Sequence, residues 1–221
     1  MSVAIRPYQA ADRAGLREVC LAAGLRGRDI RHWLDHPDIW ADIWTAAYVE
    51  REPENCWVVC DDGAEGERVV GYLVATADTE ASERYFTRAV LPRIAGRAIF
   101  RGHWLSGKDR TFFARTIRAM RRGELSLPPG VAREYPGHFH FNLLAGFRGA
   151  GLGGRLYDLF VTRMRDLNVP GVNSQVMTAN QPVVDFHHRR GYAEVFRSQA
   201  KALSNYFEQG PVELAVFVKK L

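Results

Sequence analysis

The sequence has few of the residues on which metal sites and disulfide-stabilised folds depend. It holds three cysteines among 221 residues, and no Cys and His are paired at the spacing of a structural zinc site. Cys56 and Cys60 share one face of a predicted strand but are too far apart for a disulfide, and Cys20 lies on an apolar helical stripe. We therefore expect three buried, reduced cysteines and no metal.

Long apolar runs are also absent. No stretch is apolar over the length that a bilayer-spanning helix needs, and the sequence does not start with the basic-then-apolar pattern of a signal peptide. We expect a cytoplasmic protein that stays out of the membrane. The length of 221 residues and the hydrophobic content of 47% fit one α/β domain over residues 1–221 with a sizeable core.

The stretch His138 to Gly154 predicts a strand that runs into a glycine-rich turn and then into a helix. Phe139, Phe141 and Leu143 alternate with polar residues, which is the period of a strand with two different faces. After the glycines, apolar residues recur at helical spacing until Asn168, Pro170 and Gly171 end the helix.

The turn itself predicts an anion site. Its residues are Arg148, Gly149, Ala150, Gly151, Leu152, Gly153 and Gly154. Glycines allow several backbone N–H groups to converge on one anion at the positive end of a helix, without a Cβ that would hold the ligand away. Arg148 and Arg155 add full positive charges. We infer a binding site for a phosphate or pyrophosphate.

Two kinds of ligand compete for this turn. Gly149, Gly151 and Gly154 satisfy the GxGxxG pattern of dinucleotide-binding proteins, but the ribose-binding acid expected about 20 residues later is missing. An ATP-type P-loop is excluded, because no Gly-Lys-Ser/Thr follows the glycines. The other ligand is coenzyme A.

The coenzyme A interpretation rests on two motifs in order. Arg148-Gly149-Ala150-Gly151-Leu152-Gly153 is followed by Asn180, and then by Phe186-His187-His188-Arg189-Arg190-Gly191-Tyr192. This order resembles the GNAT superfamily of acyl-CoA N-acyltransferases. The resemblance implies an α/β fold with a mixed, mostly antiparallel sheet, splayed strands, helices on both faces, and acetyl-CoA as cofactor.

The resemblance also implies roles for individual residues. The backbone of Leu143, Leu144 and Ala145 would pair with the pantetheine arm, and Asn180 would hydrogen-bond it. The N–H groups of residues 148–154 would hold the pyrophosphate. His187 stands where the family most often has a tyrosine that protonates the leaving thiolate. It would either act as this acid or only stack on or hydrogen-bond the cofactor.

A polar strand face upstream of the turn is the predicted acceptor site. His138, His140 and Asn142 alternate with apolar residues and therefore share one face. A histidine on a strand is more often a satisfied structural residue. Two of them beside an asparagine, next to the cofactor turn, support the hypothesis that His140 or Asn142 orients the acceptor amine or a relay water.

Residues 79–136 depart from the minimal GNAT plan and form a predicted helical insertion. They carry 12 Lys and Arg against 5 Asp and Glu, whereas the whole chain has a net charge of +5. This charge predicts either a surface that faces anions or solvated helix faces. Since no reading motif accompanies it, we do not expect nucleic-acid binding. The insertion also resembles that of the acetyltransferase-like domain of eukaryotic O-GlcNAc hydrolases and its bacterial relatives.

Three functions remain open from the sequence. The first is transfer of an acetyl group from acetyl-CoA to a primary amine of a small molecule or peptide. The second is a module that binds acetyl-CoA without catalysis, and the third is a dinucleotide-dependent oxidoreductase. The last predicted strand, Val212 to Val218, could also pair across a homodimer as an edge strand.

Overall fold

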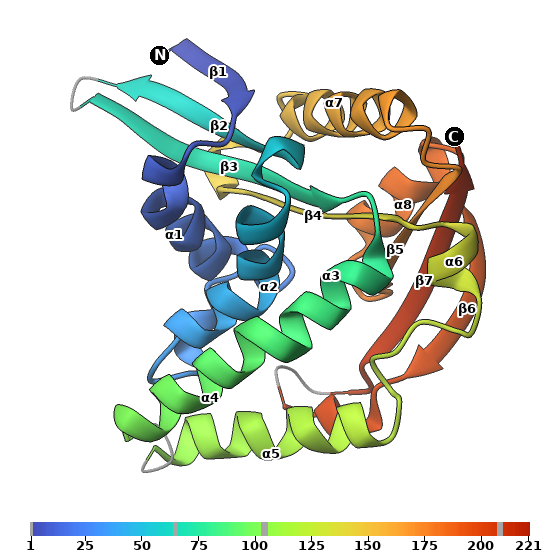
Figure 1. Ribbon diagram of the computed structural model, residues 1–221. Helices are drawn as coiled ribbons and strands as arrows, with labels where there is room; N and C mark the ends of the chain where they lie inside the picture. Colours follow the sequence, from blue (N-terminus) through green and yellow to red (C-terminus); the bar gives the residue numbers. More distant parts are fainter. Residues whose placement is uncertain (1, 64–65, 103–105, 207–209) are drawn as a thin grey trace.

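The centre of the protein is one mixed sheet. The computed structural model describes residues 2–63, 66–102, 106–206 and 210–221. The seven strands lie in the order β1-β2-β3-β4-β5-β7-β6 (Figure 1). All neighbouring pairs are antiparallel except β4 and β5. The strands are β1 (Ser2–Pro7), β2 (Cys56–Gly63), β3 (Gly66–Thr76), β4 (Gly137–Leu143), β5 (Gly171–Met177), β6 (Ala193–Gln199) and β7 (Glu213–Lys220).

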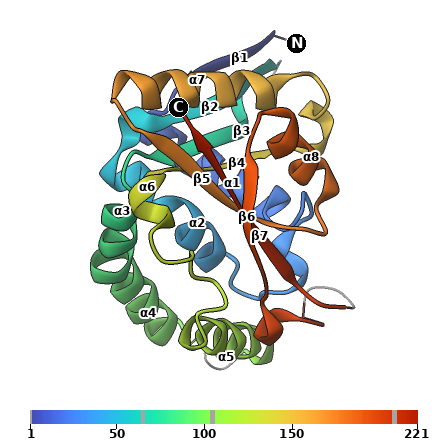
Figure 2. The same cartoon turned by 90° about the vertical axis from the view of Figure 1, so that its right-hand side faces the viewer.

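Helices cover both faces of this sheet (Figures 1 and 2). The alternation within β2 divides the core, because Cys56 and Val58 pack with α1 and α2 whereas Trp57 and Val59 pack with α7. This confirms the predicted fold class. The helices are α1 (Arg13–Ala23), α2 (Asp38–Arg51), α3 (Thr79–Tyr85), α4 (Leu91–Phe100), α5 (Gly107–Arg121), α6 (Val131–Glu134), α7 (Leu152–Asp166) and α8 (Gln181–Arg189).

Strands β4 and β5 pair over only two positions and then diverge. Gly137 lies opposite Val172 and His138 opposite Asn173. Beyond them β4 stays paired with β3 up to Leu143, while β5 stays paired with β7 up to Met177. A Cβ on Gly137 would lie 2.8 Å from Cγ1 of Val172, so glycine allows the close approach where the two strands meet. The predicted splay is therefore present.

Two expectations fail at the level of the sheet. Strand β7 lies between β5 and β6, so it is an internal strand, and the argument for a dimer through its edge is wrong. The position of a strand within a sheet depends on pairing between segments that are distant in sequence. The place of Val212 to Val218 at the end of the chain therefore does not make it an edge strand. The mostly antiparallel sheet also differs from the parallel, doubly wound sheet on which dinucleotide binding depends, so the fold does not support an oxidoreductase.

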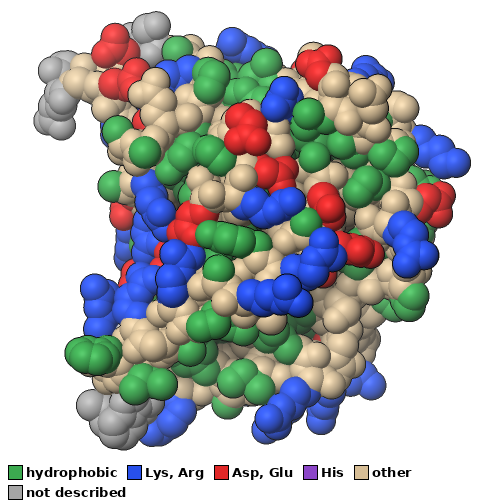
Figure 3. Space-filling model, in the orientation of Figure 1, with side chains coloured by type: hydrophobic (Ala, Val, Ile, Leu, Met, Phe, Trp, Pro, Cys, Tyr) green, Lys and Arg blue, Asp and Glu red, His purple; other side chains and the backbone are tan. Residues whose placement is uncertain are grey.

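The segment 79–136 is helical, as predicted. It runs through α3, a π-helical turn (Phe86–Val90), α4, α5 and α6 before the chain enters β4. Figure 3 shows Lys and Arg side chains beside Asp and Glu over the middle of this view, and Lys and Arg alone at its lower edge, where α5 lies. The charge of the segment is therefore distributed in two different ways.

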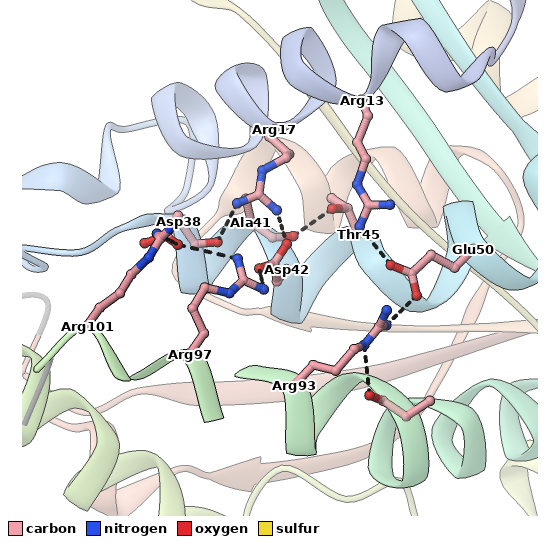
Figure 4. Close-up of polar contacts among 11 residues, drawn as sticks. Arg13, Arg17, Asp38, Ala41, Asp42, Thr45, Glu50, Arg93, Arg97 and Arg101 are labelled. Carbon is pink, nitrogen blue, oxygen red and sulfur yellow. Dashed lines mark hydrogen bonds and ion pairs between the residues drawn. The ribbon is translucent and has the colours of Figure 1, made fainter. Parts of the chain in front are cut away.

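Arginines fasten α4 to α2 and α1. Asp42 of α2 forms ion pairs with Arg17 of α1 and with Arg97 of α4, the latter at 2.7 Å (Figure 4). Glu50, near the end of α2, bridges Arg13 and Arg93 in the same way. These carboxylates are almost buried, so the contact between the helices depends on paired charges as well as on the apolar cluster of α2 and α4.

The described part of the chain can be searched for disulfides, membrane-spanning helices and metal sites. Within it, all three cysteines are unpaired and buried. No helix there has the length and apolarity needed to cross a bilayer, and no cluster of metal-ligating side chains occurs in the same residues. Strands β2 and β3 pair as an antiparallel hairpin, and residues 64–65 between them lie outside the described part.

Candidate functional site

The glycine turn presents the uncapped start of α7. Gly149 and Gly151 have φ of +81° and +75°, a region that favours glycine, and a Cβ built on either would meet no atom within 4 Å. Gly151 occupies the N-cap position, and no side chain caps the helix there. The first N–H groups of a helix need acceptors. The open space and the positive end of α7 therefore fit a phosphate group.

The charges around this turn differ from the predicted ones. Arg148 extends away from the turn: its Nε donates to the carbonyl of Leu143 at 2.9 Å and an Nη to that of Gly27 at 3.0 Å. Arg155 is exposed in the first turn of α7. Arg190, part of the second motif but given no role there, lies near this turn and pairs with Asp158.

Arg190 adds positive charge beside the start of α7. Its guanidinium carbon lies 4.9 Å from the ring centroid of Tyr157 and 5.6 Å from that of Phe186. A Cβ on Gly154 would come within 2.7 Å of an Nη atom of Arg190. The glycine at this position is therefore the one sequence signal that could have located this arginine.

The end of β4 supplies backbone groups to the gap, but not from all three predicted residues. The N–H of Leu144 donates to Val70 at 3.0 Å, and its carbonyl accepts from Phe147 at 3.0 Å. Since neighbouring residues of a strand point their backbone groups to opposite sides, those of Leu143 face the gap. Its carbonyl accepts from Arg148. Ala145 begins a 3-10 turn (Ala145–Phe147).

The polar face of β4 lies against α2, and each histidine there has a tyrosine partner. The Tyr48 hydroxyl lies 2.9 Å from Nδ1 of His138, and the Tyr72 hydroxyl lies 3.1 Å from Nδ1 of His140. Trp44 stacks on His140 with ring centroids 5.1 Å apart. The three residues His138, His140 and Asn142 therefore share a face, as predicted, and two of them are held by partners far away in sequence.

Asn142 sets the tautomer of His140 through Tyr72. With the amide oriented so that its nitrogen donates to the carbonyl of Ala23 at 3.2 Å, its oxygen accepts from the Tyr72 hydroxyl at 2.9 Å. This orientation satisfies both ends of the amide. Tyr72 then has to accept at its oxygen from Nδ1–H of His140, which leaves Nε2 of His140 with a lone pair.

Burial keeps both histidines neutral. Burial, with a smaller contribution from the charge of a second histidine, lowers the pKa of His138 to about 4 and that of His140 to about 3. At neutral pH both rings can accept a hydrogen bond from an amine. With pKa values this low, neither ring is an effective general base at neutral pH, because its protonated form is only slightly populated.

The structure does not bring His187 to the same face. It lies in α8 among aromatic rings, with 1% of its surface exposed, and its ring is stacked on Phe139 on the opposite side of β4. Its Nδ1 lies 2.7 Å from the carbonyl of Val183 and therefore carries the proton. Its buried Nε2 has no partner among the described residues. Burial lowers the pKa of His187, so the ring is a neutral acceptor.

Asn180 occupies the N-cap position of α8 at the end of β5, across the gap from β4. Its carbonyl accepts from Val183 and Val184, but its side chain does not cap the helix. The side-chain amide of Asn180 therefore makes no hydrogen bond to the first turn of α8.

A cavity of about 530 Å³ lies between α2, α3, the π-helical turn and residues 120–132, and it is linked to the polar face of β4 through Tyr48. Its wall includes Tyr48, whose hydroxyl bonds His138, and two carboxylates, those of Glu80 and Glu83. The pKa of Glu83 is raised by partial desolvation and by the charge of Glu80. Apolar side chains complete the lining, among them Ile43, Phe86, Leu125 and Leu127.

Comparison with known proteins gives structural matches over the whole chain. No protein-family model matches the sequence. The crystal structure of SsHAT superposes with a TM-score of 0.76 at 28% identity, covering 100% of this chain and 98% of that one. A polyamine N-acetyltransferase of Drosophila melanogaster, described as forming N-acetylagmatine, gives 0.62 at 17% identity and covers 100% of both chains. The putative acetyltransferase yncA of Salmonella typhimurium, solved with its cofactor acetyl-CoA, gives 0.57 at 14%, covering 100% and 95%.

These matches show that the chain adopts the GNAT fold. At identities below 25%, the second and third matches support the fold alone.

Proposed function

We propose that this chain is an acetyl-CoA-dependent N-acetyltransferase that acts on a primary amine. The observation that carries the proposal is the gap between β4 and β5, which begins after His138 and Asn173, together with the uncapped N-terminus of α7 at the end of β4. One opening thus has backbone groups on one side and an anion site at its end.

The residues present fit the cofactor. The backbone groups of Leu143 and Ala145 would hold its pantetheine arm, and the unused amide of Asn180 would bind the arm from the other side of the gap. The N–H groups of residues 149–154, with Arg155 and Arg190 nearby, would hold the pyrophosphate. Bound acetyl-CoA would supply an acetyl group activated as a thioester.

The polar face of β4 would position the acceptor. Nε2 of His140 has a lone pair because Asn142 and Tyr72 fix the tautomer, so it can accept a hydrogen bond from an incoming amine. Since the pKa of His140 is about 3, its role would be to orient the neutral amine. As the new C–N bond forms and the C–S bond of the thioester breaks, the amine proton would pass to water and the leaving thiolate would take a proton from water. The rate should then rise with pH as the acceptor ammonium loses its proton.

The cavity that Tyr48 links to this face supports a cationic acceptor. Glu80 and Glu83 place two carboxylates on its wall, and only Glu80 has an ion pair in the described chain, to Arg84 at 3.7 Å. An ammonium group would relieve their mutual repulsion. Tyr48 connects the same wall to His138. We therefore propose an amine with a second positive charge, from either a small molecule or a peptide.

The test is a coenzyme A release assay with acetyl-CoA and a panel of amines that includes spermidine, agmatine and a lysine peptide. We expect turnover with at least one cationic amine, and a KM raised tenfold or more in Glu80→Gln/Glu83→Gln with little change in kcat. Glu54→Gln, an exposed carboxylate on another surface, is the matched control. His140→Ala should instead lower kcat. Unaltered kcat would remove His140 from the mechanism.

A binding module without catalysis is the second candidate. It is favoured by the buried Nε2 of His187, which in the neutral ring cannot donate a proton, and by the absence of a carboxylate from the described residues of β4. The observation that selects it is tight binding of acetyl-CoA with no acetyl transfer to any amine in the panel.

The helical segment 79–136 bears on the number of domains and on the relatives of this chain. We treat residues 1–221 as one domain, because the helical segment 79–136 shares apolar clusters with α2. We also propose kinship with the acetyltransferase-like domain of eukaryotic O-GlcNAc hydrolases. Its support is the helical segment before the strand that leads into the glycine turn.

A further inference from the structure

A second cavity lies on α5, on the part of the molecule seen at the lower edge of Figure 3. Its volume is about 410 Å³, and it is formed by one face of α5, the C-cap residue of that helix and the 3-10 turn Lys201–Leu203. No carboxylate lines it. Its lining consists of Arg110, Thr111, Ala114, Arg115, Arg118, Arg122, Lys201 and Ala202.

The positive charges of this cavity are largely uncompensated. Among the described residues, one of its five cations has an ion pair, namely Arg122, which lies 3.6 Å from Glu124. That carboxylate also accepts from the N–H of Ala202 at 2.9 Å. Like charges held in one cavity repel each other, so a bound anion would lower the free energy of the folded protein.

Arg115 is held in place by groups that do not neutralise it. One of its Nη atoms donates to the carbonyls of Ala202 and Ser204 at 3.3 and 3.0 Å. Its guanidinium carbon lies 5.3 Å from the ring centroid of Tyr206. Carbonyl and ring contacts fix the position of a cation but leave its full charge available. The cavity thus contains one positive charge whose position is fixed by neutral groups.

The arginines of α5 and its C-cap that line the cavity form the α5 row, which consists of Arg110, Arg115, Arg118 and Arg122. The dipole of the helix does not explain the position of all of them. Cations near the C-terminus of a helix are stabilised by its dipole, which accounts for Arg118 and Arg122. Arg110 lies near the opposite end, four residues after the N-cap Ser106, where the dipole disfavours a cation. A ligand that contacts both ends would account for the position of Arg110.

The spacing of the row matches an extended chain. Along the helix axis, Arg110 and Arg118 are about 12 Å apart and Arg118 and Arg122 about 6 Å apart, at a rise of 1.5 Å per residue. Alternate side chains of an extended peptide lie about 6.8 Å apart on one side. No aromatic residue lines the cavity to stack on a base, which argues against single-stranded nucleic acid. We infer that this cavity binds an extended acidic peptide segment with carboxylates at alternate positions.

The test is fluorescence anisotropy of a labelled, blocked Glu-Ser pentarepeat with the full chain at low ionic strength. We expect saturable binding that weakens at least fivefold in Arg110→Gln/Arg118→Gln. Binding should stay unchanged in Arg88→Gln/Arg133→Gln, which removes two exposed arginines elsewhere in the segment 79–136. The substituted arginines are exposed, so unfolding midpoints should stay the same.

The inference would be overturned if the peptide did not bind the wild type, and by either of two further results. One is equal affinity of the wild type and Arg110→Gln/Arg118→Gln for the peptide. The other is tighter binding of a ten-residue oligothymidylate than of the peptide, lost in the same variant, which would assign the cavity to nucleic acid. Acetyl-CoA binding, measured in parallel, should be the same in all these variants. A failure of the peptide to bind is therefore distinguishable from a failure of the proposed function.

Discussion

Two groups of arginines in the same half of the molecule have opposite surroundings. Between α1, α2 and α4, five arginines contact three carboxylates, and Figure 4 shows them interleaved. On α5 and the neighbouring 3-10 turn, five cations share a cavity with no carboxylate in its lining. The first arrangement holds helices together. The second does not contribute in this way, and it leaves charge available for a ligand.

The contrast shows that composition alone does not assign a role to a basic segment. Residues 79–136 carry both arrangements, since Arg93, Arg97 and Arg101 belong to the first and the α5 row to the second. The difference lies in α2, a separate part of the sequence, which provides Asp38, Asp42 and Glu50. Removing a carboxylate from the first region should therefore destabilise the fold, and adding one to the α5 row should weaken ligand binding.

The largest effect is expected for Asp42→Ala. The Asp42 side chain is 4% exposed, and its loss would leave Arg17 without its ion pair and Arg97 with only the longer one to Asp38, at 3.5 Å. We expect the free energy of unfolding to fall by about 3 to 5 kcal/mol. Urea unfolding measures it. A loss below about 1 kcal/mol, the usual value for an exposed ion pair, would show that this region is no more structural than the α5 row.

A smaller, pH-dependent effect is expected for Glu50→Gln. Burial acts to raise the pKa of Glu50, but hydrogen bonds from Arg93 and Arg13 outweigh it and lower the value. A carboxylate of this kind stabilises the protein above its unfolded pKa of about 4.5 and loses that contribution as pH falls through its folded pKa. Glu50→Gln should cost about 2 kcal/mol at pH 7. The difference from wild type in thermal unfolding should shrink near pH 3, and a constant difference would contradict the ion-pair explanation.

Introducing a carboxylate into the α5 row should weaken the binding of the acidic peptide. Ala114 lines the cavity one helical turn from both Arg110 and Arg118, so Ala114→Glu would pair with each of them. We expect affinity for the acidic peptide to fall about tenfold, or about 1.4 kcal/mol. Ala114→Gln, which adds the same bulk without charge, should retain binding. Equal losses in the two variants would show that the effect is steric.

The smallest effect is expected for the stability of Arg118→Gln. Its side chain is exposed and has no ion pair in the described chain, so the free energy of unfolding should change by less than about 0.5 kcal/mol. Chemical unfolding alongside Asp42→Ala gives the comparison. A loss above about 1 kcal/mol would mean that the α5 row also holds the fold together.

The local parts of the site could be predicted from the sequence. The period of residues 138–143 fixes a two-faced strand, and the glycines after Arg148 fix an open helix start, because both depend on neighbours in the chain. The partners of the two histidines could not be predicted. Tyr48 and Tyr72 reach them from 90 and 68 residues away, through the packing of α2 and the pairing of β3.

Side-chain direction was the other limit. Arg148 stands in the turn by sequence, but carbonyls of Leu143 and Gly27 hold its guanidinium elsewhere, and Arg190 from another helix lies beside the turn instead. His187 occupies the expected position, yet α8 turns it into the aromatic core. A motif specifies backbone geometry more firmly than it specifies where the charges around it point.

The most direct measurement for the whole account is calorimetric titration of acetyl-CoA into the wild type and Gly151→Trp. Gly123→Trp is the matched control, since Gly123 also has a positive φ and open space around it and lines neither cavity. The account predicts saturable binding at one site, weakened at least a hundredfold by Gly151→Trp and retained in Gly123→Trp. No binding to the wild type, or equal binding in Gly151→Trp, would contradict the assignment of the glycine turn to the cofactor.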